Sequence, residues 1–119
     1  MEWRYPLYYL RLSTLGMQGG ALPLKQEWQG FTREAAEAAT EKEGIYEIGD
    51  QDQAVIYIHG TDNIRRELLD HFEDGFSYIE PARYFRYEEA FMYTSKENEH
   101  IRLFMRKADQ LPKYNQELI

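Results

Sequence analysis

Two tyrosines in the stretch GIYEIGDQDQAVIYIHG, Tyr46 and Tyr57, are the first candidates for chemistry in this chain of 119 residues. In an alternating strand, Tyr57 lies on the face opposite Ile56 and Ile58, so it points away from the core if the isoleucines form it. A phenol has an ordinary pKa of about 10 and acts as a base near neutral pH only when a neighbour tunes it. Packing of both rings inside an ordinary hairpin is the structural alternative.

Two consecutive arginines, Arg65 and Arg66, and a downstream histidine, His71, are the next candidates. The arginines fall in the first turn of an expected helix, where a cation opposes the helix dipole. This position favours either a phosphate partner or plain exposure to solvent. Arginine suits phosphate because its guanidinium is planar and binds two oxygens at once. His71 falls late in the same helix, where a charged imidazole suits the dipole, and a functional role is the alternative.

The hairpin and the helix that position these residues follow from local signals. Short apolar runs over residues 45–48 and 54–58 flank the turn-rich segment GDQDQ, which predicts an antiparallel β-hairpin. Asp62 or Asn63 can cap the next helix, expected over residues 64–72. Its apolar positions recur every four residues and predict a buried stripe of Ile64, Leu68 and Phe72.

Downstream of this helix, the sequence predicts one more strand and one more helix. Aromatic residues over 84–92 favour the strand. Ser95 is a suitable cap for a helix over 96–108, followed by a loop over 111–115. The inward face of this helix is expected to carry Ile101, Phe104, Met105 and Ala108.

Upstream of the hairpin, residues 3–12 predict an extended aromatic segment, and the run REAAEAATEKE after Thr32 predicts a helix. These elements form an expected N-terminal extension over residues 1–43 that packs on a core domain over residues 44–119. The aromatic segment either covers an edge of the sheet or mediates a homodimer, and the sequence leaves both open.

The composition limits the classes of protein that fit. The formal net charge of −7 opposes non-specific attraction to DNA, and the absence of cysteine excludes thiolate zinc sites and cysteine nucleophiles. No apolar run approaches the roughly 18–20 residues that a membrane span needs, and the N-terminus is a poor signal peptide. A cytoplasmic location is therefore expected. The three histidines lack the spacing of a metal site.

The sequence carries a series of short motifs that begins in the first strand of the expected hairpin. In order, they are Gly44-Ile45-Tyr46, Tyr57-Ile58, Asn63-Ile64-Arg65-Arg66, His71, Tyr84-Phe85-Arg86-Tyr87 and Pro112-Lys113-Tyr114-Asn115. In this order the motifs resemble the GIY-YIG endonuclease superfamily over about residues 44–115. The resemblance implies an α+β fold with a small three-stranded antiparallel sheet flanked by helices. It also implies cleavage of a DNA strand with one divalent metal ion, Mg²⁺ or Mn²⁺.

The resemblance further implies roles for individual residues. Tyr46 and Tyr57 would face a shared cleft, where one of them helps to activate water. His71 would assist them and Asn115 would support the site. A helix arginine would stabilise the phosphate, which makes Asn63, Arg65 and Arg66 the candidates for phosphate binding. A glutamate on the last helix would bind the metal, and Glu97 and Glu99 are the two candidates. Glu97 is preferred because it shares a face with Ile101 and Phe104.

Three departures from the family pattern bear on activity. The ungapped register places Glu67 where the phosphate arginine is expected and Leu103 where the metal glutamate is expected. His59 replaces the glycine of the second triplet. Two functions therefore stay open: a metal-dependent endonuclease acting on DNA, and a non-catalytic binding module that retains the GIY-YIG fold.

Overall fold

The computed structural model describes residues 24, 26–73 and 78–118. The strands are β1 (Gln29–Gly30), β2 (Gly44–Gly49), β3 (Val55–Thr61) and β4 (Tyr84–Glu89). The helices are α2 (Arg33–Glu37), α3 (Ile64–Asp70), α4 (Tyr93–Ala108) and α5 (Lys113–Leu118). The expected aromatic segment over residues 3–12 lies outside the described residues, and the expected α+β class is confirmed.

The sheet is antiparallel and has four strands in the order β1-β4-β2-β3, so the prediction of three strands was wrong. The additional strand, β1, is only two residues long and pairs Gln29 with Phe85 and Gly30 with Tyr84. Such a short strand has no periodicity of its own and forms because the outer edge of β4 offers unpaired backbone groups. The described part of the expected N-terminal extension is therefore built into the sheet.

The hairpin of β2 and β3 is confirmed, with an irregularity that alters which side chains share a face. Ile48 pairs with Tyr57 and Gly49 pairs with Val55, so Ile56 is an extra residue in the ladder. Such a bulge reverses the alternation of side chains beyond it. Ile56 therefore packs on the same side as Tyr46, whereas Ile58 packs on the opposite side. The prediction that Ile56 and Ile58 share a face was wrong.

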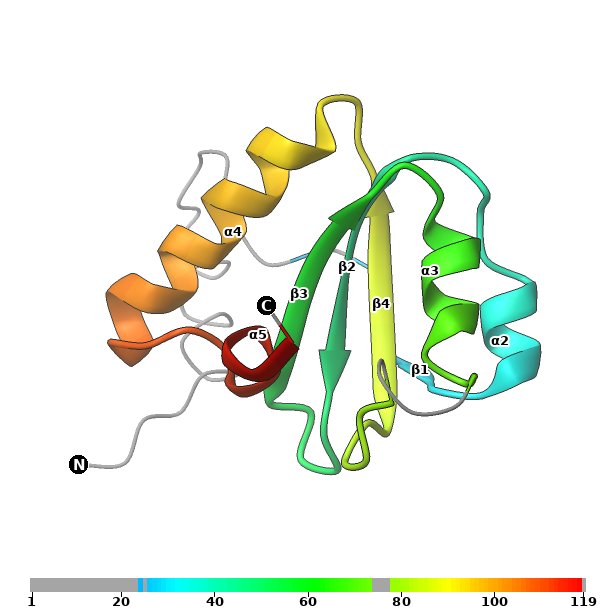
Figure 1. Cartoon of the computed structure of the whole chain (residues 1–119), viewed down its shortest axis with the longest axis horizontal. Helices are drawn as coiled ribbons and strands as arrows, with labels where there is room; N and C mark the ends of the chain where they lie inside the picture. The colour runs from blue at the N-terminus through cyan, green and yellow to red at the C-terminus, as the bar shows by residue number, and fades with distance from the viewer. Residues whose placement is uncertain (1–23, 25, 74–77, 119) are drawn as a thin grey trace.

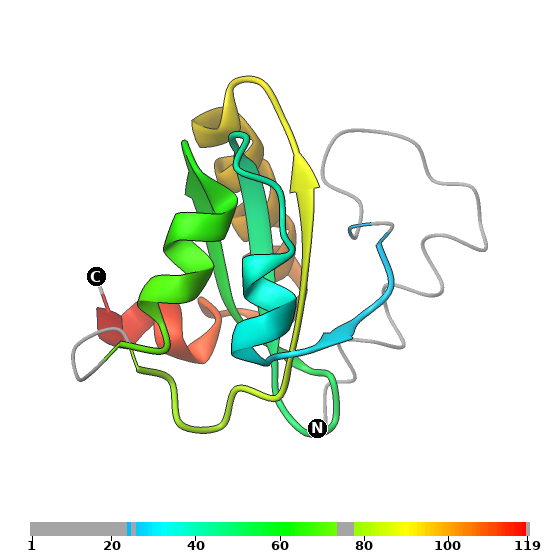
Figure 2. The same cartoon turned by 90° about the vertical axis from the view of Figure 1, so that its right-hand side faces the viewer.

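Helices α2 and α3 cover one face of the sheet (Figure 1, Figure 2). Thr32 and Asn63 cap them as predicted, because each side chain accepts a hydrogen bond from a backbone N–H in the first turn. Helix α2 ends earlier than expected, since the carbonyls of Thr40 and Lys42 leave the helical path and accept hydrogen bonds from the first N–H groups of α3. The predicted stripe is confirmed at Ile64 and Leu68, which are fully buried.

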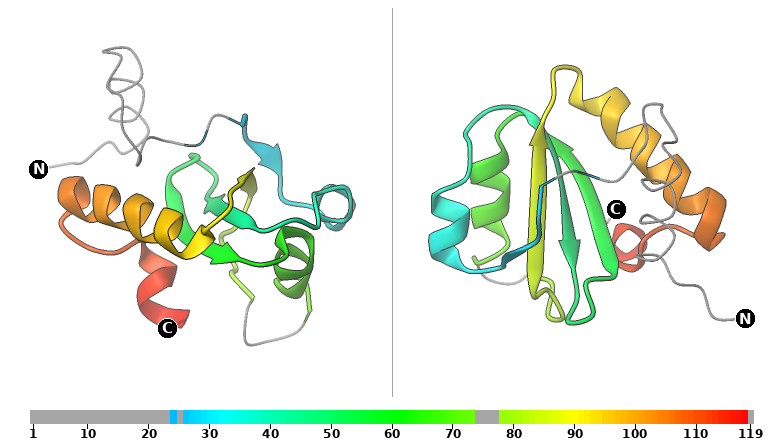
Figure 3. Two further views of the ribbon diagram at one scale, coloured as in Figure 1. Left: turned by 90° about the horizontal axis from the view of Figure 1, so that it is seen from above. Right: turned by 180° about the vertical axis from the view of Figure 1, so that it is seen from behind.

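Helix α4 covers the opposite face, as the view from above shows (Figure 3). It begins at Tyr93 rather than after Ser95, because Met92 adopts a left-handed conformation with φ of 64° and turns the chain into the helix. Phe104 is buried as predicted, but Met105 is 43% exposed and the inward position is taken by His100. None of the helices in the described part of the chain is long and apolar enough to cross a membrane.

The segment after α4 is helical and not the predicted loop. Asp109 ends α4 in a left-handed conformation, Pro112 is buried, and α5 begins at Lys113. Proline is compatible with the start of a helix because its missing N–H would be unpaired there in any case. Helix α5 lies beside β3, the outer strand of the sheet (Figure 1).

Candidate functional site

The site is centred on a hydrogen bond between two buried side chains. The Tyr46 Oη atom lies 2.7 Å from Nε2 of His71, and the two side chains are 0% and 4% exposed. Tyr46 projects from the central strand β2, and His71 is the C-cap of α3. The fold therefore joins two of the predicted site residues, which are 25 positions apart in the chain.

Two half-buried rings, those of Tyr57 and His59, complete the site above this pair. They stack with centroids 5.7 Å apart and planes 19° apart. The Tyr46 ring lies 6.1 Å from that of Tyr57 and 5.8 Å from that of His59, and the Tyr57 ring lies 5.6 Å from that of His71. Tyr46 and His71 thus form a buried floor, and Tyr57 and His59 form an accessible rim.

Burial, with nearby carboxylates, keeps the two phenols protonated. Burial, and then the charges of Tyr57, Glu67, Asp70 and Glu97, raise the pKa of Tyr46 well above its usual range. Burial, followed by Glu67 and Glu97, raises the pKa of Tyr57 to about 12. Without a nearby cation, both tyrosines are therefore neutral hydrogen-bonding groups near pH 7.

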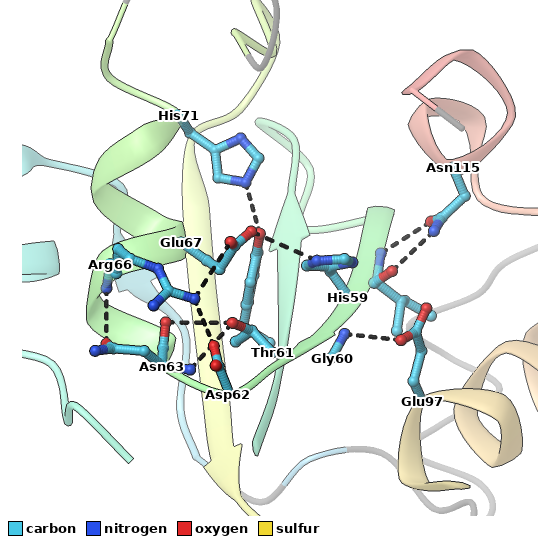
Figure 4. Close-up of polar contacts among 12 residues, drawn as sticks. His59, Gly60, Thr61, Asp62, Asn63, Arg66, Glu67, His71, Glu97 and Asn115 are labelled. Atoms are coloured by element: carbon cyan, nitrogen blue, oxygen red, sulfur yellow. Dashed lines mark hydrogen bonds and ion pairs between the residues drawn. The ribbon is translucent and has the colours of Figure 1, made fainter. Parts of the chain in front are cut away.

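Glu67 lies at the rim and contacts two potential cations. Its carboxylate is 3.5 Å from Nε2 of His59 and 3.9 Å from Nη2 of Arg66. Figure 4 shows the rings of His59 and His71 directed toward one region from different elements, with Glu67 beside them. Glu67 is thus part of the site, at the position where the family resemblance implies an arginine.

The predicted phosphate-binding residues hold the ends of helices. Arg65 donates to the carbonyl of Ala39 at 2.9 Å and to Glu41 at 3.1 Å, which ties α3 to the end of α2. Arg66 is exposed and paired with Asp62, and it has no ring contact with the tyrosines among the described residues. The Asn63 side chain accepts the N–H of Arg66 as the N-cap.

Glu97 and Asn115 both occupy the free edge of β3. An outer strand exposes the N–H and C=O groups of alternate residues, which need partners. Oε1 of Glu97 accepts the N–H of Gly60 at 3.1 Å. The Asn115 side chain accepts the N–H of Ile58 at 2.9 Å and donates to its carbonyl at 2.8 Å, as a neighbouring strand would (Figure 4).

Replacing Asn115 by alanine is expected to lower the free energy of unfolding by about 2 kcal/mol, because two buried backbone groups of Ile58 lose their partners. Urea unfolding measures this change. Asn98→Ala is the matched control, since Asn98 is exposed on α4. Equal stabilities of the two variants would show that Asn115 does not hold the edge of β3.

The donor set limits the kind of metal that the site can hold. Among the described residues, no group of three or more His, Cys, Asp or Glu side chains is arranged to bind a metal ion. A zinc site, which takes three or four protein ligands, is therefore not built there. A single carboxylate such as Glu97 fits Mg²⁺ or Mn²⁺, because Mg²⁺ in particular retains several waters and binds through one or two carboxylates and the substrate phosphate. Leu103 is the residue that the ungapped register places at the position of the metal glutamate. It packs against the apolar cluster under α4.

Sequence reasoning identified Tyr46, Tyr57 and His71 as site residues but did not assign a role to His59 or Glu67. Strand alternation was the available signal for His59, which shares the face of Tyr57 two residues earlier. Glu67 lies one helical turn before His71, and this spacing of four residues places both side chains on the same face of α3.

The fold and the site define a small α+β protein with a phenol–imidazole pair under an open, partly acidic rim. The model of the family "Domain of unknown function (DUF7508)" matches residues 22–110, and the chain belongs to this family. The match includes β1 to α4 and crosses the boundary expected near residue 43. No curated protein matches the chain.

Proposed function

We propose that this site hydrolyses phosphodiester bonds in DNA with one divalent metal ion, as the resemblance to the GIY-YIG endonucleases implies. The observation that carries the proposal is the hydrogen bond of 2.7 Å between Tyr46 Oη and His71 Nε2. It links a hydroxyl to an acceptor that can take its proton. A phenol with a raised pKa is rarely deprotonated near neutral pH. It can therefore take a proton from water only if it passes its own proton to such an acceptor.

The pair supports a proton transfer in two parts. As a water molecule attacks phosphorus, the bond from phosphorus to the leaving sugar oxygen breaks, and this oxygen takes up a proton from solvent. Tyr46 Oη accepts a proton from the attacking water and passes its own proton to Nε2 of His71. The positive charge then rests on the imidazole of His71, which shares a face of α3 with the carboxylate of Glu67. This step uses the tautomer of His71 in which Nε2 carries no proton. Tyr57 remains protonated and donates its hydroxyl to a phosphate oxygen.

Glu97 is the residue that would hold Mg²⁺ or Mn²⁺. Its carboxylate is held at the edge of β3 because it accepts a hydrogen bond from the N–H of Gly60. The ion would neutralise charge on the phosphate and lower the pKa of water. The hydrogen bond from Gly60 occupies one lone pair of Oε1 and leaves the other carboxylate oxygen for the ion.

The proposal is tested by nicking of supercoiled plasmid with and without Mg²⁺ or Mn²⁺. We expect nicking that chelation by EDTA abolishes. Tyr46→Phe should slow it about 100-fold, because the proton transfer is lost while the buried ring remains. Glu97→Gln should abolish the metal-dependent nicking, since an amide can still accept the N–H of Gly60 but binds a divalent ion poorly.

Matched variants separate chemistry from contamination. Tyr84→Phe removes a hydroxyl from the opposite face of the sheet, where the Tyr84 ring contacts Trp28, and Glu99→Gln removes an exposed carboxylate from the same helix as Glu97. Both should nick at the rate of the unmodified chain. Nicking that persists unchanged in Tyr46→Phe and Glu97→Gln would place the activity outside this site.

A second candidate function is a binding module without catalysis. The observation that favours it is Glu67, whose carboxylate lies at the rim beside His59 in a chain of net charge −7. Such a rim disfavours a bare phosphate. The absence of metal-dependent nicking in a folded preparation would support this function over hydrolysis.

A further inference from the structure

In the part of the chain that the structure describes, few side chains near the two tyrosines can carry a positive charge. Arg65 is committed to the end of α2 and Arg66 to Asp62. Among the described residues, the side chains that contact the rings of Tyr46 and Tyr57 and can carry positive charge are His59 and His71. Nε2 of His71 is already bonded to Tyr46. A phosphate that approached Tyr46 would therefore meet His59 at the rim.

We infer that His59 contacts the phosphate of the substrate and that Glu67 positions its ring for this contact. The inference rests on the proposed function and assigns a substrate-binding residue to it. It also gives a reason for the carboxylate at residue 67, which acts on the histidine and not on the phosphate.

The geometry of His59 suits this role. Its side chain is 34% exposed and its ring stacks on Tyr57, so the imidazole is accessible yet held in one plane. Nε2 faces the carboxylate of Glu67 at 3.5 Å. An imidazolium has two N–H donors, so the donor at Nε2 can face Glu67 while Nδ1–H serves a phosphate oxygen. Hydrogen bonds between charged groups are stronger than neutral ones.

The arrangement also places the phosphate correctly for the chemistry. The His59 ring lies 5.8 Å from that of Tyr46 and 5.7 Å from that of Tyr57. The His59 ring therefore neighbours both tyrosine rings, so a phosphate bound to His59 would lie on the same face of the sheet as the two tyrosines.

Binding can be measured apart from hydrolysis by NMR of the imidazole nitrogens in the full chain. The probe is a thymidine dinucleotide with a phosphorothioate link, added without metal. The chain has three histidines, which makes assignment simple. We expect the ring signals of His59 to shift with the probe. Those of His100, on the buried side of α4 and on the opposite face of the sheet, should stay unchanged and report that the fold is intact.

Variants test the two roles separately. His59→Gln should weaken binding of the dinucleotide and raise KM for plasmid about tenfold, and His59→Arg should restore both. Glu67→Gln should reduce the shift of the His59 signals on addition of the probe, which loss of a merely structural contact would not do.

The outcomes separate this inference from the proposed function. Nicking without a shift of His59, or with an unchanged KM in His59→Gln, would overturn the phosphate contact and leave hydrolysis standing. A shift of His59 in a chain that does not nick would refute hydrolysis and support the contact. If neither is seen, both are refuted.

Discussion

Replacing Arg86 by methionine is expected to lower the free energy of unfolding by about 3–5 kcal/mol, because it leaves a buried carboxylate without its counter-ion. Glu47 is 0% exposed, and its Oε1 accepts the Nε–H of Arg86 at 2.8 Å. The guanidinium lies 4.1 Å from the ring centre of Trp28. Oε2 of Glu47 is buried and has no hydrogen-bond partner among the described residues, so the pair with Arg86 is the principal stabilisation of this charge there.

Denaturant unfolding near neutral pH measures the loss, and Arg102→Met on the exposed side of α4 is its control. The double variant Glu47→Leu with Arg86→Met should recover most of the stability, since an apolar pair needs no counter-charge. If Arg86→Met were as stable as Arg102→Met, the pair would not hold β2 to β4.

The loss caused by Arg86→Met should also depend on pH. Burial raises the pKa of Glu47, whereas the charge and hydrogen bond of Arg86 lower it, so removal of Arg86 raises this pKa further. A folded-state pKa above the unfolded value causes a penalty that is absent below the unfolded value and grows as pH rises through the folded value. The difference between Arg86→Met and the unmodified chain should therefore be smaller at about pH 4 than at neutral pH.

Replacing Gly44 by alanine should have a comparable or larger effect, with a loss of about 4 kcal/mol or failure to fold. A Cβ atom at Gly44 would lie 2.1 Å from the carbonyl oxygen of Glu88 and 2.9 Å from Cα of Glu89. Both atoms belong to the backbone of β4, which pairs with β2 at this point. No change of side-chain rotamer can relieve such a clash, so the strands would have to separate.

Thermal unfolding followed by circular dichroism compares this variant with Gly30→Ala. A Cβ at Gly30 would meet no atom of the described part of the chain within 4 Å, and β1 lies on the same sheet. Gly30→Ala should therefore unfold close to the temperature of the unmodified chain. A Gly44→Ala variant with equal stability would contradict the close approach of β2 and β4.

These contacts show where sequence reasoning was sufficient. The hairpin, the Asn63 cap and the buried positions Ile64 and Leu68 depend on residues close together in the chain. Turn composition, capping side chains and apolar periodicity act over a few residues, so the sequence carries them in readable form. The same signals placed Tyr57 on the face opposite Ile58.

Other features depended on groups that are distant in the sequence. The bulge at Ile56 changed a predicted face, and the strand β1 formed against Phe85 and Tyr84. Helix α5 was predicted as a loop because its short run has little periodicity. In each case the deciding factor is an unpaired backbone edge or a packing surface that exists only once the sheet has formed.

The same division holds for the site. By itself, the sequence determined which side chains can handle protons: two tyrosines on a hairpin and a histidine at the end of the next helix. Only the tertiary structure decided that Tyr46 bonds to His71, that Arg65 and Arg66 are held elsewhere, and that His59 and Glu67 meet at the rim. The physical reason is that residue type fixes the chemistry available to a side chain, whereas its partners depend on how strands and helices from separate parts of the chain pack.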